Sequence, residues 1–76
     1  MSWRERIELD PEVLVGKPVV RGTRLAVEFI LDMIASDVAE QEIMSSYPRL
    51  THDDILACVA YANEAVKSER VYPLAV

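Results

Sequence analysis

The spacing of apolar and polar residues divides this chain near residue 26. Residues 6–10 alternate polar and apolar side chains, as a half-buried strand does. Two breaks follow, at Asp10-Pro11 and at Gly16-Lys17-Pro18, because proline and glycine favour turns. Residues 6–25 are therefore predicted to form a short β element of strands and turns.

A tight connection is predicted inside this element, at Arg21-Gly22-Thr23. The apolar pair Val19-Val20 precedes it and Arg24-Leu25 follows it. Glycine has no Cβ and reaches backbone conformations that other residues resist. Gly22 is therefore expected to allow the chain to reverse between the two flanking segments.

From Ala26 the spacing becomes helical, with apolar residues every three or four positions over roughly ten residues. Ser36-Asp37 is predicted to end this helix, and Asp37 to cap a second helix with Glu40 three residues later. Pro48 is predicted to end the second helix. The expected inner faces are Val27, Ile30, Leu31 and Ile34 in the first helix, and Ala39, Ile43 and Tyr47 in the second.

A third helix of roughly eighteen residues is predicted to start after Thr51. Residues 51–54 have the form of a capping box, with Thr51 as the N-cap and two aspartates near the positive end of the helix dipole. Lys67 and Arg70 suit the negative end. The inner face is expected to consist of Ile55, Val59, Ala62 and Val66, widened by Leu56, Cys58 and Tyr61.

Together these elements predict a mostly α fold within one domain, residues 1–76. The β element at 6–25 precedes a three-helix bundle at 26–70, and a short apolar tail at 71–76 follows it. The second and third helices match the helix-turn-helix arrangement in outline. Three-helix packing is also a common way to bury apolar stripes, so this outline alone does not establish a role in reading DNA.

Composition shows that this small domain has no covalent or metal cross-link of its own. Apolar burial and ordering entropy nearly cancel in a chain of 76 residues. Cys58 is the only cysteine and His52 the only histidine, so neither a disulfide nor a Cys/His metal site can form within the chain. Self-association into a homodimer or higher oligomer, or a protein partner, is expected to supply the missing stability.

The ends of the sequence give no sign of export or membrane insertion. Residues 3–6 carry charges where a secretory signal needs an apolar run. No stretch approaches the roughly 18 apolar residues of a membrane span. A cytoplasmic location without membrane contact is therefore expected.

Charge is spread unevenly along the chain. Residues 1–24 carry five basic and four acidic side chains, a formal charge of +1, whereas residues 25–76 carry three basic and nine acidic ones, a charge of −6. DNA affinity depends largely on Lys and Arg that neutralise phosphates. Any DNA contact is therefore expected from the first third of the chain.

The candidate contact residues lie around the predicted glycine turn. In one interpretation its arginines are simply solvated; in the other, a rigid turn presents them to phosphates or to an acidic partner surface. A nucleotide phosphate loop is not expected, because proline follows the lysine and the upstream glycine is missing. The candidates for contact with DNA or a partner are Lys17, Arg21, Gly22, Thr23 and Arg24.

Tyr72 and Leu74 in the apolar tail are candidates for a partner interface. A short extended apolar segment suits strand addition to a partner's sheet. The alternative interpretation is that these side chains close the domain's own core. Tyr47, Pro48 and Tyr61 are open to the same two interpretations.

No catalytic site, metal site or cofactor is predicted. His52, Asp53 and Asp54 are explained by their position at the start of a helix, as capping and dipole residues. Common hydrolase, metalloprotease and redox motifs are absent, and Cys58 lies between apolar neighbours as a buried cysteine does. The sequence thus predicts a protein that acts by binding and is not an enzyme.

An ordered set of motifs over residues 6–66 resembles the bacterial domain-of-unknown-function family 433. The resemblance implies a homeodomain-like helix-turn-helix fold preceded by a small strand element, and an antitoxin-like role beside a PIN-like ribonuclease toxin. The family supplies no catalytic residues. The motifs are Asp10-Pro11, the segment Gly16 to Arg24 with Gly16, Lys17, Pro18, Arg21, Gly22, Thr23 and Arg24, the Tyr47-Pro48-x-Leu50-Thr51 junction, and Ala60-Tyr61-Ala62.

Two departures qualify this resemblance. The chain has almost no tail after the third helix, where many antitoxins keep a longer segment that wraps the toxin. The third helix also opens with Asp53 and Asp54, where a recognition helix presents residues to base edges and phosphates. Toxin contact would then involve the folded domain itself.

The leading hypothesis is a non-catalytic antitoxin that forms a homodimer, occludes a PIN-like nuclease and contacts operator DNA weakly through Lys17, Arg21 and Arg24. One alternative is a small transcriptional regulator without a toxin partner, for which DNA affinity should fall steeply with salt. Another is an oligomeric adaptor domain. The three hypotheses differ in the partner that they require.

Overall fold

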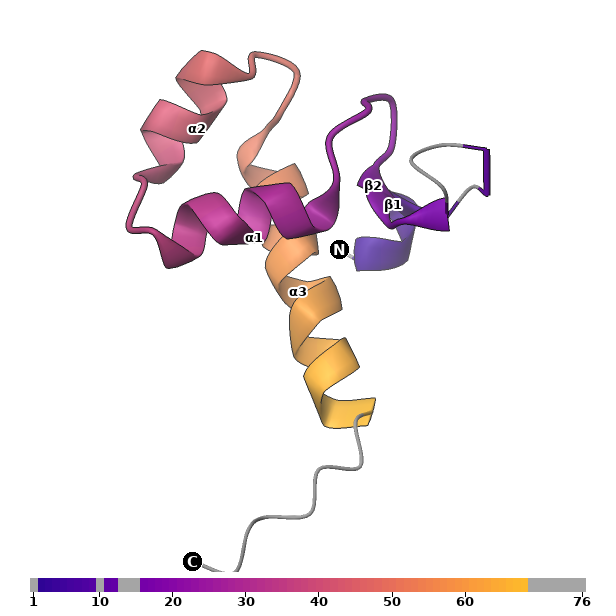
Figure 1. Ribbon diagram of the computed structural model, residues 1–76. Coiled ribbons are helices and arrows are strands. Elements are labelled where there is room, and N and C mark those ends of the chain that lie inside the picture. Colours follow the sequence, from indigo (N-terminus) through magenta and orange to yellow (C-terminus); the bar gives the residue numbers. More distant parts are fainter. Residues whose placement is uncertain (1, 10, 13–15, 69–76) are drawn as a thin grey trace, which may run out of the picture.

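The computed structural model describes residues 2–9, 11–12 and 16–68 (Figure 1). It confirms the prediction of a mostly α fold with three helices after a short β element. Tyr72 and Leu74 of the predicted tail lie outside the described residues. In chain order the elements are the 3-10 helix η1 (Trp3–Glu5), strands β1 (Ile7–Glu8) and β2 (Val19–Val20), and helices α1 (Val27–Ala35), α2 (Glu40–Ser46) and α3 (His52–Ser68).

The two strands form an antiparallel pair in which Ile7 lies opposite Val20 and Glu8 opposite Val19. Both valines and Ile7 are buried. Beyond β2 the chain reverses: the backbone N–H of Thr23 donates to the carbonyl of Val20 at 3.0 Å. Gly22 sits in this turn with a φ of +82°, a left-handed conformation that costs side chains with a Cβ about 1–2 kcal/mol. The predicted tight connection is confirmed.

The three helices are arranged around the start of α3. In Figure 1, α1 lies across the first turns of α3, whereas the later turns of α3 extend beyond the other two helices. The helix η1 packs beside α3, where the indole Nε1 of Trp3 donates to Oε2 of Glu64 at 2.5 Å and the Trp3 ring meets the edge of Tyr61. The N-terminal residues therefore support the projecting part of α3.

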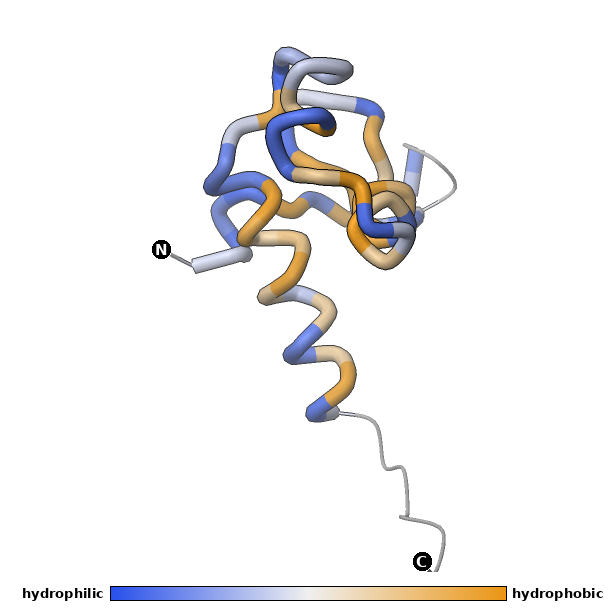
Figure 2. Tube along the Cα trace, turned by 90° about the vertical axis from the view of Figure 1, so that its left-hand side faces the viewer, coloured by the Kyte–Doolittle hydropathy of each residue, from blue (hydrophilic) through white to orange (hydrophobic). Residues whose placement is uncertain are grey.

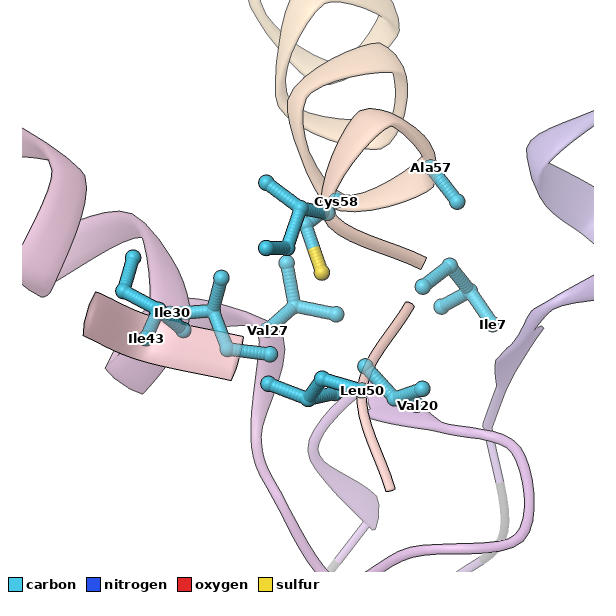
Figure 3. Packing of buried hydrophobic residues seen from close by; sticks show 9 residues of the cluster. Ile7, Val20, Val27, Ile30, Ile43, Leu50, Ala57 and Cys58 are labelled. Atoms are coloured by element: carbon cyan, nitrogen blue, oxygen red, sulfur yellow. The ribbon is translucent and has the colours of Figure 1, made fainter. Parts of the chain in front are cut away.

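The buried core joins the strands to all three helices (Figure 3). Each strand contributes an aliphatic side chain, and the α2–α3 junction contributes Leu50. The β element is thus part of the core and not an appendage. The core cluster consists of Ile7, Val20, Val27, Ile30, Ile43, Leu50, Ile55, Ala57 and Cys58.

The end of α1 is as predicted, but the predicted cap of α2 is wrong. Asp37 has a φ of +66°. Its N–H donates to the carbonyl of Ile34, and the N–H of Val38 donates to that of Met33, both at 3.0 Å, which is the Schellman pattern of a helix C-terminus. Asp37 therefore terminates α1, and α2 begins after Ala39 without a side-chain cap.

The predicted capping box at the start of α3 is confirmed. The N–H of Asp54 donates to Oγ1 of Thr51 at 3.1 Å, and the N–H of Thr51 donates to Oδ2 of Asp54 at 3.0 Å. The second oxygen of Asp54 accepts from Nη1 of Arg6 at 3.0 Å. This buried aspartate is consequently satisfied on both oxygens and ties the residue before β1 to α3.

The predicted inner face of α3 is correct in part. Ile55 is buried as expected, but Leu56, Val59 and Val66 are 44%, 45% and 67% exposed. Cys58 is fully buried and Tyr61 packs against the core, both as expected, and Ala57, which lies outside the predicted face, is also fully buried. The helix has apolar residues on two sides, and the other elements approach closely only on the side that carries small residues.

Candidate partner-binding site

The glycine turn is held rigidly by its own threonine. Oγ1 of Thr23 donates to the carbonyl of Val20 at 2.7 Å and accepts from the N–H of Leu25 at 3.0 Å. The N–H of Val20 in turn donates to the carbonyl of Leu25 at 3.0 Å. Of the predicted contact residues, Gly22 and Thr23 therefore shape the turn. The hydroxyl of Thr23 makes its hydrogen bonds within the turn.

Two of the predicted cationic contacts already have partners within the chain. Nε of Arg21 donates to the carbonyl of Glu5 at 3.1 Å, and its Nη1 lies 3.8 Å from a carboxylate oxygen of Glu8. Nζ of Lys17 lies 2.5 Å from Oε1 of Glu28, and this hydrogen bond raises the pKa of Lys17 above its ordinary value. Both side chains are exposed, so their ion pairs contribute little stability.

Arg24 differs from its neighbours in the turn. Its side chain is exposed and makes no hydrogen bond or ion pair with any of the described residues. A guanidinium group offers five donors in a planar fork that suits carboxylates and phosphates. Arg24 is therefore the predicted contact residue whose donors are available to a partner.

The structure also brings to the turn a segment that the sequence places far away. Nη1 of Arg49, in the α2–α3 junction, donates to the carbonyl of Gly22 at 3.1 Å. A hollow of about 240 Å³ lies between the two segments. Its lining consists of Thr23, Arg24 and Leu25 from the turn and of Ser46, Tyr47, Pro48 and Arg49 from the junction.

The hollow combines an apolar lining with two cationic groups. Leu25, Tyr47 and Pro48 belong to its lining, and the Tyr47 ring makes an edge contact with Phe29 at 5.6 Å between centroids. Arg24 and Arg49 belong to the same lining. Apolar and aromatic surface next to arginine is typical of protein interfaces.

The site residues that the sequence did not single out are Ser46 and Arg49, whereas Tyr47 and Pro48 were candidates for either a partner interface or the domain's own core. The Tyr47-Pro48 junction was recognisable as a motif. Its proximity to the glycine turn could not be predicted, because it depends on how α1 and α2, which separate the two segments in the chain, pack in the fold. Arg49 is one of only three basic residues after residue 24. That scarcity was the one signal that could have singled it out.

His52 and Asp53, at the start of α3, contact other parts of the domain. His52 pairs with Glu40 of α2, and the hydrogen bond between them raises the pKa of His52. Asp53 lies 3.5 Å from Nη2 of Arg6. Burial, and secondarily the charge of Asp54, raises the pKa of Cys58 to about 12, which keeps this core thiol protonated at neutral pH.

The side of α3 that faces away from the core is unlike that of a DNA-reading helix. It carries the exposed Leu56 and Val59, and the exposed carboxylate of Asp53 lies in its first turn. Recognition helices present polar and basic residues to base edges and phosphates. This surface is instead apolar with an acidic start.

The described residues lack two features, a cluster of metal ligands and a helix suited to cross a membrane. No three His, Cys, Asp or Glu side chains gather there in a way that could hold a metal ion. No helix in the described part of the chain is both long and apolar enough to cross a membrane.

Fold and site together define a small three-helix protein of helix-turn-helix outline, with a two-stranded element whose turn packs on the helix junction. Over residues 7–62 the chain matches the family described as "Protein of unknown function (DUF433)", and it belongs to that family. The resemblance to this family, which the sequence motifs indicate, is therefore confirmed.

A crystal structure of a DUF433 member protein from Anabaena variabilis has a similar fold, with a TM-score of 0.77 and 26% sequence identity. The similarity covers 82% of this chain but 61% of that protein, so this chain spans less than two thirds of its length. No curated protein matches this chain.

Proposed function

We propose that this chain is a cytoplasmic, non-catalytic antitoxin-like protein that neutralises a PIN-like ribonuclease toxin through the hollow beside Arg24. The observation that carries the proposal is the guanidinium group of Arg24, which is unpaired among the described residues and lines the same hollow as Leu25, Tyr47 and Pro48. Such a surface is complementary to an apolar segment that carries a carboxylate.

A nuclease is a chemically suitable partner. Metal-dependent nucleases hold their catalytic ions with carboxylates, and a guanidinium group that pairs with such a carboxylate competes with the ion. Ribonucleases also need a basic surface for RNA phosphates. The charge of −6 on residues 25–76 would complement that basic surface and speed association.

The rival function is a transcriptional regulator that acts without a toxin. The helix-turn-helix outline supports it, but the apolar outer side of α3 and the acidic charge of the helical region weigh against it. A regulator of this kind should bind operator DNA alone, with an affinity that falls steeply as salt increases.

The test is a pull-down of the tagged full chain from its own cells, followed by mass spectrometry and by a nuclease assay on the recovered complex. We expect a small ribonuclease in fixed ratio, inactive until it is separated from this chain. Recovery of the chain alone, together with salt-dependent binding to its own promoter, would favour the regulator.

Arg24→Ala should reduce recovery of the nuclease at least about tenfold, because it removes a charge-assisted contact at the centre of the interface. Arg21→Ala is the matched control, since it removes the same group three positions away, where it is held by Glu5 and Glu8. Equal losses in the two variants would contradict the proposed role of the hollow.

A further inference from the structure

An apolar stripe runs along the outer side of α3. With 3.6 residues per turn, Leu56, Val59, Asn63 and Val66 lie on one side of the helix, opposite the buried Ala57 and Cys58. The three aliphatic members are 44%, 45% and 67% exposed. Figure 2 shows apolar segments recurring along α3 to its last described turn, beyond the body of the domain. The outer stripe is defined here as Leu56, Val59, Asn63 and Val66.

The outer stripe has the spacing of a helix that packs on another helix. Its members are three, four and three residues apart, which is the a/d pattern of two heptads. Asn63 occupies one a position, where a single polar residue limits the number of helices that associate. No described element covers the aliphatic side chains of the stripe, which stay exposed in the folded domain.

We infer that the outer stripe pairs α3 with α3 of a second copy of this chain, in antiparallel orientation, to form a homodimer. A stripe that is a/d spaced throughout is complementary to itself, as a two-fold interface requires. Antiparallel pairing places Leu56 against Val66 of the second copy and Val59 against its Asn63. This interface does not depend on the proposed antitoxin role.

Charge distribution favours a second copy in this orientation. Asp53 and Lys67 flank the outer stripe on the same side, two heptads apart at the e position, and lie at opposite ends of α3. Antiparallel pairing brings each Asp53 next to Lys67 of the other copy, whereas in a parallel pair e positions face g positions, and Lys67 would lie beside Ala62 of the other copy without an opposite charge. Lys67 makes no hydrogen bond or ion pair with a described residue, so it is available for this contact.

The shape of the domain fits the same arrangement. The later turns of α3 extend beyond α1 and α2 (Figure 1). In an antiparallel pair, the projecting half of each α3 lies along the first half of the other. Both ends of the outer stripe are then covered, and the association supplies the stabilisation that a 76-residue chain without an internal cross-link needs.

The test measures the mass of the full chain by analytical ultracentrifugation over a concentration series. The wild type should be a dimer, and Val59→Glu should weaken dimerisation at least about tenfold, because it places two unpaired charges at the centre of the interface. Ala65→Glu is the matched control: it adds the same charge to an exposed alanine of α3 that lies off the stripe, and it should stay dimeric. A monomeric wild type, or a dimeric Val59→Glu, would overturn the inference.

Further variants guard this test against misfolding and test the orientation. Val66→Glu changes the most exposed member of the stripe, which makes no core contact, so it should fold normally by circular dichroism and still lose the dimer. Lys67→Glu should weaken the dimer, because it places two acidic side chains next to each other. Adding Asp53→Lys should restore the affinity of dimerisation, since each pair between positions 53 and 67 is then formed again with the two charges exchanged. If the double variant is no tighter than either single variant, the antiparallel orientation is wrong.

Discussion

The sequence suggests that the glycine turn contacts a partner and that the apolar side chains of α3 fill the core, but the structure shows the reverse for several of these side chains. The turn is rich in polar and cationic residues, yet Lys17, Arg21 and Thr23 make their contacts inside the domain. The third helix has the spacing of a core helix, yet Leu56, Val59 and Val66 remain exposed. Polar residues of the turn thus hold the fold together, whereas apolar residues of α3 stay exposed.

This contrast has one physical cause. Backbone groups in a tight turn need hydrogen-bond partners, and a nearby polar side chain such as Thr23 supplies them. Apolar side chains make no such directional demand, so an apolar stripe stays outside whenever the other side of its helix packs better. Residue type alone therefore did not separate structural from interacting positions here.

The largest expected effect separates the two sides of α3. Ile55→Ala should lower the free energy of unfolding by about 2–5 kcal/mol, because it leaves a cavity in the core. Val66→Ala should lower it by less than about 0.5 kcal/mol in the monomer, where the side chain is mainly exposed. Urea denaturation of both variants in the Val59→Glu background measures the difference. Similar losses would mean that the outer stripe is packed within one chain.

The next effect concerns the turn. Thr23→Val should cost about 1–3 kcal/mol, because the partly buried N–H of Leu25 loses its acceptor and the carbonyl of Val20 loses a donor. Thr23→Ser keeps the hydroxyl and is the control, with a smaller loss expected. Thermal unfolding measures both. If valine were as stable as threonine, the turn would not depend on this hydroxyl.

Arg24→Ala should change stability by less than about 0.5 kcal/mol, because its side chain is exposed and has no partner among the described residues. Arg49→Ala should cost more, since Nη1 of Arg49 bonds the carbonyl of Gly22 and joins the turn to the α2–α3 junction. Thermal unfolding of both variants gives the comparison. A clear loss of stability in Arg24→Ala would show that this arginine has a structural role and weaken the case for partner contact.

The smallest effect is a pH dependence at the contact between α2 and α3. Glu40 raises the pKa of His52 above 6.5, so the folded state binds this proton more tightly than the unfolded state. The contribution to stability is complete below the unfolded pKa and is lost as pH rises through the folded pKa. His52→Gln should remove this pH dependence of the free energy of unfolding. Unfolding curves measured below the unfolded pKa and above the folded pKa of His52 test it. An unchanged pH profile would show that the exposed pair contributes nothing.

Local signals in the sequence predicted the elements well. The helical spacing after residue 26, the glycine turn and the Thr51 capping box were all correct, because each depends on residues within one or two turns of one another. The cap at Asp37 failed although it is local. Aspartate is suited both to a helix N-cap and to the left-handed residue that ends a helix. The presence of Glu40 three residues later favoured the N-cap interpretation.

The candidate site was only half predictable. Arg24, the glycine turn and Tyr47 were candidates from the sequence, whereas Arg49 was not, and nothing in the sequence placed Tyr47 beside the turn. The hydrogen bond from Arg49 to Gly22 spans 27 residues. Such a contact exists only once α1 and α2 have packed and brought the junction back to the turn.

The sequence by itself determined the helices, the β element and the shortage of internal cross-links, since these follow from spacing, turn chemistry and composition. Only the tertiary structure decided which side of α3 enters the core and which residues the turn uses for itself. Both sides of α3 carry apolar residues, and the small side chains of Ala57 and Cys58 let the other elements approach closely on one of them. Close packing in three dimensions, which no local pattern encodes, made that choice.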